Sequence, residues 1–320
     1  MGQDGTFRYD QLLSDFSVGL GQGDMVMDRV LPPVLEDYQS GKYAIFGPEN
    51  LTPLDDTRAP GAQAKESRWS ISDAAFYCSG HALKDYVPRE SQRNGAPNID
   101  LIQNTTLTLT EQILLNKEIA GLAAIVAGMS TYYGAQTATP WDNDSYDPIT
   151  IVKTQATAIA LRVGKRPNVF VCAQPVWDAI CENGNVIGRI TGAPNLESSA
   201  VIPQAVAALL GVDEVIVASA VKNTAILGQA AVNAWVWGEY ALLAVRPRLP
   251  GQRIMALGAT FTWRGALQAL AGEGGGATGG RLVERYWVQD RKSDCIEVHD
   301  HYDHKIVAQA AGYLFTDCLT

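Results

Sequence analysis

Residues 42–88 read as one long β-hairpin, and this feature limits the folds open to the chain more than any other. KYAIFG runs outward, and RWSIS and AFYCSGHALKDYV return; both sides are rich in aromatic and β-branched residues, as strands are. The polar stretch DDTRAPGAQAKE, residues 55–66, lies between them. Two strands alone bury too little surface to be stable in water. We therefore expect the hairpin to lie against another surface, on a second copy of the chain.

A long amphipathic helix is predicted within residues 98–131. Apolar residues recur there at spacings of three and four, the pattern of one buried helical stripe. The stripe consists of Leu115, Ile119, Leu122, Val126 and Met129. Glu111, Lys117 and Glu118 are assigned to the solvated side. We interpret the helix as a scaffold element because it is longer than average, although the periodicity fits an ordinary core helix equally well.

A mixed α/β lobe is predicted over residues 147–245. Asp147 caps its first helix, Pro148 takes the first helical position, and Gly164 ends the helix. The predicted elements that follow are a strand at 168–173, a short helix QPVWDAICEN, a glycine-rich loop at 183–200, a helix closed by Gly211, and the strands DEVIVASAV and AVNAWVWGEYALLAV. Trp235 and Trp237 alternate on the last of these, so we expect them to share one core-facing side.

The flanking segments give an arm and a second lobe. Residues 1–41, with two prolines in VLPPVL, read as an extended arm. Residues 89–146 and 246–320 are predicted to form one lobe around the long helix. Its last strands are IEV and KIVAQAAGYLF, with a charged turn between them.

That turn carries the one motif that suggests metal chemistry, His299-x-His301-x-Asp303-His304. Imidazoles and a carboxylate so spaced can bind Zn²⁺ or Fe, as in metallo-β-lactamase-like hydrolases. Such a site needs further ligands later in the chain, yet no histidine follows His304 and the only other one is His81. The interpretation as a polar turn is therefore preferred. The metallo-hydrolase stays as a remote alternative.

Composition argues against several other classes. Hydrophobic residues make up 47% of the chain, which fits a sizeable core. The net charge is −9, which argues against a protein that binds phosphate groups. Five cysteines without a CxxC pair favour structural thiols in a reducing compartment. The N-terminus lacks the pattern of a secretory signal. No GxSxG, HExxH, Walker A or strand-following GxGxxG motif occurs, so we expect no enzyme and no cofactor.

Two smaller clusters have structural and functional interpretations. Asp142, Asp144 and Asp147 suggest a Ca²⁺ loop, but an EF-hand needs a glycine at position six and a glutamate at position twelve, where this chain has Asp147 and Lys153. Helix capping is the preferred role. Arg246, Arg248 and Arg253 lie in a proline-rich connection and are expected to pair with acidic residues of a neighbour rather than with DNA.

The order of these parts resembles the major capsid proteins of tailed double-stranded DNA phages, which have the Hong Kong 97-type fold. The similar pieces are VLPPVLEDYQSGKY before FGPEN and DTRAPGA, WDNDSYDP opening a helix, GKRPN before a strand, LLGVDEVIVASAVKNTA, FTW, and the final YDHKIVAQAAGYLF. Each piece is weak alone, but together they cover nearly the whole chain in a specific order.

The resemblance implies an α+β fold with four named parts: the N-terminal arm (1–41), the E-loop hairpin (42–88), the peripheral (P) domain (89–146 and 246–320, with spine helix 98–131) and the axial (A) domain (147–245). It implies a shell-building head protein that forms pentamers and hexamers around DNA in the virion and is assembled in the bacterial cytoplasm. Scaffolding, portal and decoration proteins are the expected partners. An encapsulin-like nanocompartment shell is the alternative with the same fold.

The resemblance also points to charged residues at inter-subunit contacts, and none at a catalytic, cofactor or metal site. The expected contact residues are Asp55, Asp56, Arg58, Lys65, Glu66, Arg68, Arg189, Arg246 and Arg248. Some relatives cross-link a hairpin lysine to a neighbour's asparagine. Lys65 lies near the tip, but no motif identifies the asparagine or a catalytic glutamate, so a solvated or ion-paired lysine is preferred.

Overall fold

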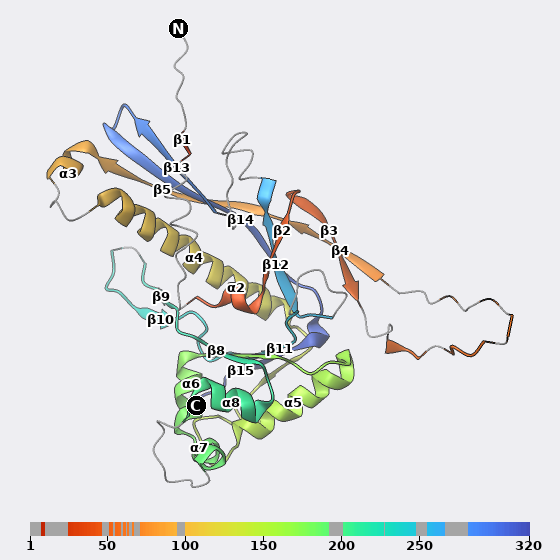
Figure 1. Ribbon diagram of the computed structural model, residues 1–320. Helices are drawn as coiled ribbons and strands as arrows, with labels where there is room; N and C mark the ends of the chain where they lie inside the picture. The colour runs from red at the N-terminus through yellow and green to blue at the C-terminus, as the bar shows by residue number, and fades with distance from the viewer. Residues whose placement is uncertain are drawn as a thin grey trace.

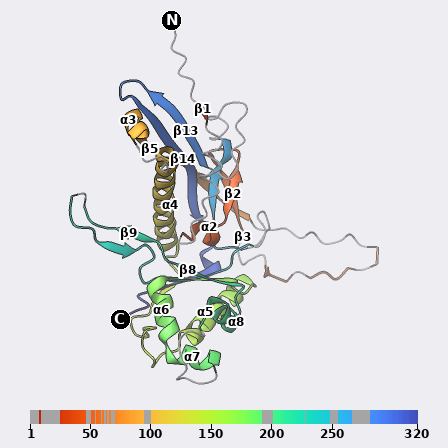
Figure 2. The ribbon, with the colours of Figure 1, turned by 60° about the vertical axis from the view of Figure 1, so that its left-hand side comes forward.

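The chain folds into two sheets joined by a long helix, and two narrow β-ribbons project from opposite sides (Figures 1 and 2). The computed structural model describes residues 8–9, 25–46, 51–53, 55–58, 60–61, 63, 66, 71–94, 100–191, 201–226, 228–247, 255–265 and 281–320. In this part of the chain, no helix is long and apolar enough to cross a membrane. Helices and strands are both abundant, as expected of the predicted α+β class.

The upper, six-stranded sheet is organised around one long strand, β14 (Ser293–Ile306). On one side it pairs with β13 (Arg281–Val288), whose other edge carries the short β1 (Arg8–Tyr9). At its other edge β14 pairs with β5 (Ser79–Pro88), and the C-terminal end of β14 also pairs with β12 (Gly258–Trp263). A parallel strand, β2 (Pro33–Glu36), completes the sheet, and α3 (Arg89–Asn94) follows β5.

The predicted long helix is confirmed as α4 (Leu101–Gly128), which packs against β14 and β5. Asp100 caps it by accepting hydrogen bonds from the backbone N–H groups of Ile102 and Gln103. Its first half packs under the upper sheet, and its second half joins the main core. Because α4 is covered on more than one side, the buried surface is wider than the predicted stripe.

The predicted polarity of α4 is wrong at two positions. Lys117 and Glu118 were assigned to solvent, but both are buried. Of the predicted stripe, Leu122 and Met129 are buried, whereas Val126 is exposed. The cause is that both charged side chains have partners inside the molecule, described below.

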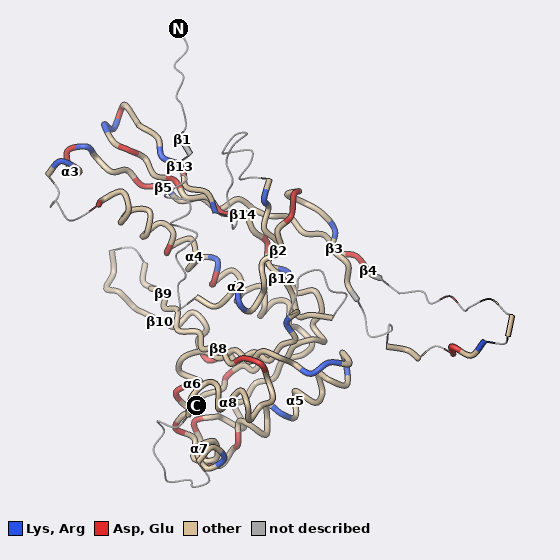
Figure 3. The backbone as a smooth tube through the Cα atoms, in the orientation of Figure 1, with Lys and Arg blue, Asp and Glu red and all other residues tan. Residues whose placement is uncertain are grey.

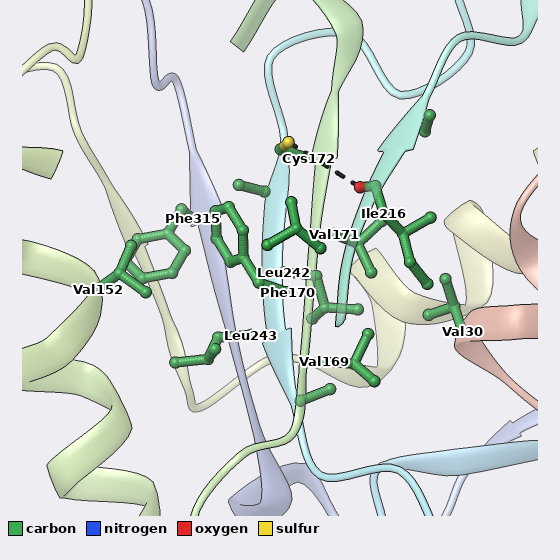
Figure 4. Packing of buried hydrophobic residues seen from close by; sticks show 14 of the residues in the cluster. Val30, Val152, Val169, Phe170, Val171, Cys172, Ile216, Leu242, Leu243 and Phe315 are labelled. Carbon is green, nitrogen blue, oxygen red and sulfur yellow. Dashed lines mark hydrogen bonds between the residues drawn. The ribbon is translucent and has the colours of Figure 1, made fainter. Parts of the chain in front are cut away.

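The lower, five-stranded sheet has the order β6–β15–β11–β7–β8, with helices against its lower face (Figure 1). Its strands are β6 (Tyr133–Ala135), β15 (Gly312–Thr316), β11 (Ala241–Ala244), β7 (Val169–Ala173) and β8 (Glu214–Ala218). The helices of this lobe are α5 (Pro148–Val163), α6 (Gln174–Glu182), α7 (Gly184–Thr191) and α8 (Pro203–Leu210). Phe170, Leu242 and Phe315 lie side by side in its core (Figure 4).

Several helix boundaries in this lobe confirm the predictions from the sequence. Asp147 accepts a hydrogen bond from the N–H of Ile149, and Pro148 begins α5. Gly164 and Gly211 end their helices with φ of 73° and 72°, the left-handed conformation that favours glycine.

Other expectations for this lobe are corrected. Residues 184–191, predicted as loop, form α7, whose Val186 and Ile187 are buried; residues 192–200 lie outside the described part. The long strand predicted before Val245 is instead two short ones, β10 (Asn233–Trp235) and β11, because the chain turns at Gly238. The turn separates the two tryptophans: Trp237 is fully buried and Trp235 is 39% exposed.

The ends of the chain also differ from the prediction. The histidine stretch lies inside β14 rather than in a turn; the turn comes later, at Val307–Ala311, and contains the 3₁₀ helix η3 (Gln309–Ala311). β15 then joins the lower sheet, not the lobe around α4. The described part of the predicted arm contains the short helix α2 (Met27–Val30), which is embedded in the core through Met27 and Val30.

Candidate inter-subunit surfaces and the buried polar centre

The predicted hairpin is confirmed where its two sides are paired. β3 (Ser40–Phe46) and β4 (Ile71–Tyr77) are antiparallel from Ser40 opposite Tyr77 to Phe46 opposite Ile71. An exposed ion pair between Lys42 and Asp73, 2.6 Å long, links the two strands and contributes little because solvent screens it. Beyond the strands, the described residues within 51–66 lie far from the body (Figures 1 and 2).

The base of the ribbon rests on its own subunit, which corrects the expectation that a second copy supplies the covering surface. Phe76 is buried and stacks on Phe261 of β12, with ring centroids 4.4 Å apart and an interplanar angle of 7°. Tyr43 stacks on the same ring at 5.2 Å. Gly41 makes room for this, since a Cβ there would lie 2.8 Å from the Phe76 ring. The expectation of a neighbour's surface therefore remains only for the outer ribbon.

The predicted contact residues fall into three groups. Asp55, Asp56, Arg58 and Glu66 are exposed on the outer ribbon. Lys65, Arg68 and Arg248 lie outside the described residues. Arg189 and Arg246 make ion pairs within the chain. The charged tip stays a predicted contact, while the two paired arginines already have a structural role.

Arg246 belongs to a cluster that holds α2 against the lower sheet. Its guanidinium donates to Glu214 on β8 at 3.0 Å and to the carbonyl of Arg29 at 2.7 Å, and Arg29 also pairs with Glu214. Burial raises the pKa of Glu214, but the hydrogen bonds and charges of Arg29 and Arg246 outweigh it and lower that pKa overall. Arg246 was expected to pair with an acidic residue of a neighbour, but it pairs with Glu214 of its own subunit.

The acidic loop before α5 has hydrogen-bonding roles. Asp144 accepts from the N–H of Gly184 at 2.7 Å, Asp142 accepts from Thr320, and Asp147 caps α5 and pairs with Arg189. The three carboxylates thus bind different groups instead of converging on one point. In the described residues, no three His, Cys, Asp or Glu side chains are placed to hold a metal ion.

The histidine motif is divided between the two faces of β14, because successive side chains of a strand point to opposite faces. His299, His301 and Asp303 lie on one face and are half-buried; His304 lies on the other and is buried. The predicted remote alternative, a metal site using all of these residues, is therefore wrong. His301 instead meets the edge of Trp263, with ring centroids 5.5 Å apart.

His304 is held as a neutral side chain. Thr260 Oγ1 donates to the carbonyl of Leu31 at 3.0 Å and lies within hydrogen-bond distance, 2.9 Å, of His304 Nδ1. Burial and the nearby charge of Lys117 lower the pKa of His304 to about 4. A protonated ring here would be costly.

Opposite His304 lies a buried polar centre between α4, α2 and the upper sheet. Lys117 Nζ pairs with Asp28 at 2.8 Å and lies 5.4 Å from the centroid of the Tyr302 ring. Asp300 is fully enclosed; burial raises its pKa, and the charges of Lys117 and Arg281 partly offset this. These groups join three elements that are distant in sequence.

Glu118 joins α4 to both α2 and the lower lobe. Its side chain is almost completely buried, with 1% exposure. One oxygen accepts from the N–H groups of Val26 at 3.1 Å and Met27 at 2.8 Å, and the other accepts from Trp237 Nε1 at 2.6 Å. Burial raises the pKa of Glu118, and these hydrogen bonds oppose the rise. The three donors favour the carboxylate, because both of its oxygens can accept.

Sequence comparison finds relatives that are phage proteins, and no family model matches the chain. The chain is 22% identical over 320 residues to the major capsid protein of Pseudomonas phage JBD67, covering 98% of each chain. It is 23% identical over 192 residues to the major capsid protein of Burkholderia phage BcepMu, covering 57% of this chain and 60% of the relative.

Structural comparison agrees over almost the full length. A phage-related protein from Bordetella bronchiseptica RB50 superposes with a TM-score of 0.73 at 22% identity, covering 98% of both chains. A virus-like particle from Pyrococcus furiosus and the capsid of cyanophage P-SCSP1u each give a TM-score of 0.57 at 9% identity. These likenesses confirm the predicted fold: the chain has the α+β, Hong Kong 97-type fold of phage capsid proteins.

Proposed function

We propose that this chain is the major capsid protein of a tailed bacteriophage and that its copies assemble into an icosahedral shell around double-stranded DNA. The observation that carries the proposal is the end-to-end match to the major capsid protein of phage JBD67, with 98% of each chain aligned. The match is not limited to one lobe, so it includes both the ribbon and the long helix. Every part needed for the fold is thus shared with a shell protein.

The shape of the molecule supports this role. The described residues within 51–66, beyond β3 and β4, lie away from the body and include exposed charged residues, so this segment is placed to reach over a neighbouring subunit as an E-loop (Figure 3). Residues around α4 would then form the peripheral domain, and the lobe built on α5 to β11 the axial domain. Each subunit would make several modest interfaces, and shell closure would add them together.

The net charge of the chain supports a role in enclosing DNA rather than in binding it. A net charge of −9 repels DNA phosphates, which would keep packed DNA from adhering to the wall. We further propose assembly in the host cytoplasm, with separate scaffolding and portal proteins and with decoration proteins as additional partners. We assign the chain a structural role and no catalytic one.

Deletion of residues 55–66 tests the proposed role. The deleted chain should give folded subunits, seen by circular dichroism, that form no closed particles in electron microscopy, whereas the unaltered chain forms them. Asp73→Ala is the matched control, because it changes only an exposed pair in the inner ribbon and should leave assembly intact. Normal shells from the deleted chain would contradict the proposal. Nucleic acid inside purified particles would separate a phage head from a nanocompartment that packages enzymes.

A further inference from the structure

A second ribbon projects from the lower lobe on the side opposite β3–β4 (Figures 1 and 2). It consists of β9 (Val221–Asn223) and β10 (Asn233–Trp235), antiparallel, with Val221 opposite Trp235. Lys222 is the only charged residue between positions 221 and 235, although 18% of the whole chain is charged (Figure 3). The ribbon is therefore unusually free of charge for an exposed part of a soluble protein.

The ribbon also exposes large apolar side chains. They are Val221, Ile226, Val232 and Trp235, and Ile226 is 81% exposed. An apolar two-stranded ribbon is only marginally stable alone, and its unpaired edges invite association with other chains. Several exposed apolar side chains on one projecting segment are typical of an interaction site.

The matching surface lies on α5. Its inner face buries Val152, Ile159 and Val163, and its outer face carries Leu161, which is 82% exposed. Leu161 and Ile226 are the two most exposed large hydrophobic side chains of the described residues. On the outer face of α5, Lys153, Thr157 and Leu161 follow one another one helical turn apart, so Leu161 is exposed at one end of this row and the charged Lys153 at the other.

We propose that the β9–β10 ribbon of one subunit packs on the outer face of α5, around Leu161, of the next copy in a ring. The ribbon and α5 lie on opposite flanks of the same lobe (Figures 1 and 2), so one subunit cannot bring them together, whereas a repeated rotation joins each ribbon to the next α5. Such a head-to-tail contact uses two different surfaces, and it gives a ring when the repeated rotation closes on itself. The inference rests on the proposed function, because it requires a ring of copies.

Paired cysteines test the contact. Assembled particles carrying both Ile226→Cys and Leu161→Cys are oxidised, and the products are separated by non-reducing electrophoresis. The expected result is a ladder from dimer upward. The native cysteines are buried, except for the half-buried Cys181, and each single variant measures their background. The control pair is Ile226→Cys with Tyr38→Cys, because Tyr38 is similarly exposed but lies between β2 and β3 on the upper sheet.

The outcomes separate the two proposals. A ladder at least tenfold more intense for the 226–161 pair than for the control pair supports the contact. Particles that form normally but give no more cross-linking with the 226–161 pair than with the control pair would overturn it and leave the shell function standing. If the unaltered chain forms no particles or rings at all, the shell function and this contact both fail. Leu161→Asp adds a second readout: folded subunits with at least tenfold fewer particles support the contact, and unchanged assembly overturns it.

Discussion

Replacing Glu118 with alanine should destabilise the subunit more than most single changes. The change leaves three buried donors without an acceptor: the N–H groups of Val26 and Met27 and the indole N–H of Trp237. An unsatisfied buried donor costs about 1–3 kcal/mol. Removing the carboxylate also removes its own burial penalty, which the raised pKa of Glu118 reflects. We therefore expect a net loss of about 3–5 kcal/mol in the free energy of unfolding.

Two further variants serve as comparisons for this loss of stability. Glu118→Gln keeps the shape and one acceptor oxygen, so fewer donors lose their acceptor and it should lose about 1–3 kcal/mol. Glu111→Ala changes an exposed glutamate on the same helix and should stay within about 0.5 kcal/mol of the unaltered chain.

The assay is urea unfolding of dissociated subunits, because assembly would itself add to the apparent stability. Circular dichroism follows the whole fold, and tryptophan fluorescence reports on the region of Trp237. An alanine variant within about 1 kcal/mol of the unaltered chain would refute the reasoning, since it would mean that water or another acceptor satisfies the three donors.

Three further predictions concern the other contacts. The pKa of His304 is lowered to about 4, so the unfolded chain takes up the proton first as pH falls from 6.5. The unaltered chain should lose up to about 3 kcal/mol relative to His304→Asn between pH 6.5 and 4; parallel stability profiles would contradict this. Phe76→Ala should lose about 3–5 kcal/mol and speed proteolysis of the ribbon, whereas Tyr38→Ala should not; equal protease resistance of both variants would show that the stack does not anchor the ribbon. Leu122→Asp puts a charge in the core and should abolish soluble expression; a soluble, unchanged variant would mean that this position is not sealed.

Much of the fold could be predicted from local rules. The hairpin, the long helix and the ends of α5 and α8 follow from β-branched runs, apolar periodicity and caps such as Asp147 and Gly211, which depend only on nearby residues. The predictions were wrong where residues distant in sequence determine whether a side chain is buried. Lys117 and Glu118 read as a solvated face because their partners, Asp28 and the N–H groups at the start of α2, are about ninety residues away in sequence.

The assignment of a strand to the wrong sheet has a similar cause. β15 was predicted as part of the strand KIVAQAAGYLF in the lobe around α4, but its pairing partners are β11 and β6, and no local signal identifies them. The contact residues were chosen by charge alone, and that criterion selected Arg189 and Arg246, which pair within the subunit. The β9–β10 ribbon was missed because it is distinguished by its lack of charge. A search for exposed uncharged segments requires knowing which segments are exposed.

The central claim is that copies of this chain build a closed shell, and electron microscopy of the purified protein tests it most directly. We predict closed particles of uniform diameter in which subunits cluster around fivefold and sixfold axes. A protein that stays monomeric at every concentration and salt condition tried, with or without a scaffolding protein of its phage, would contradict the account.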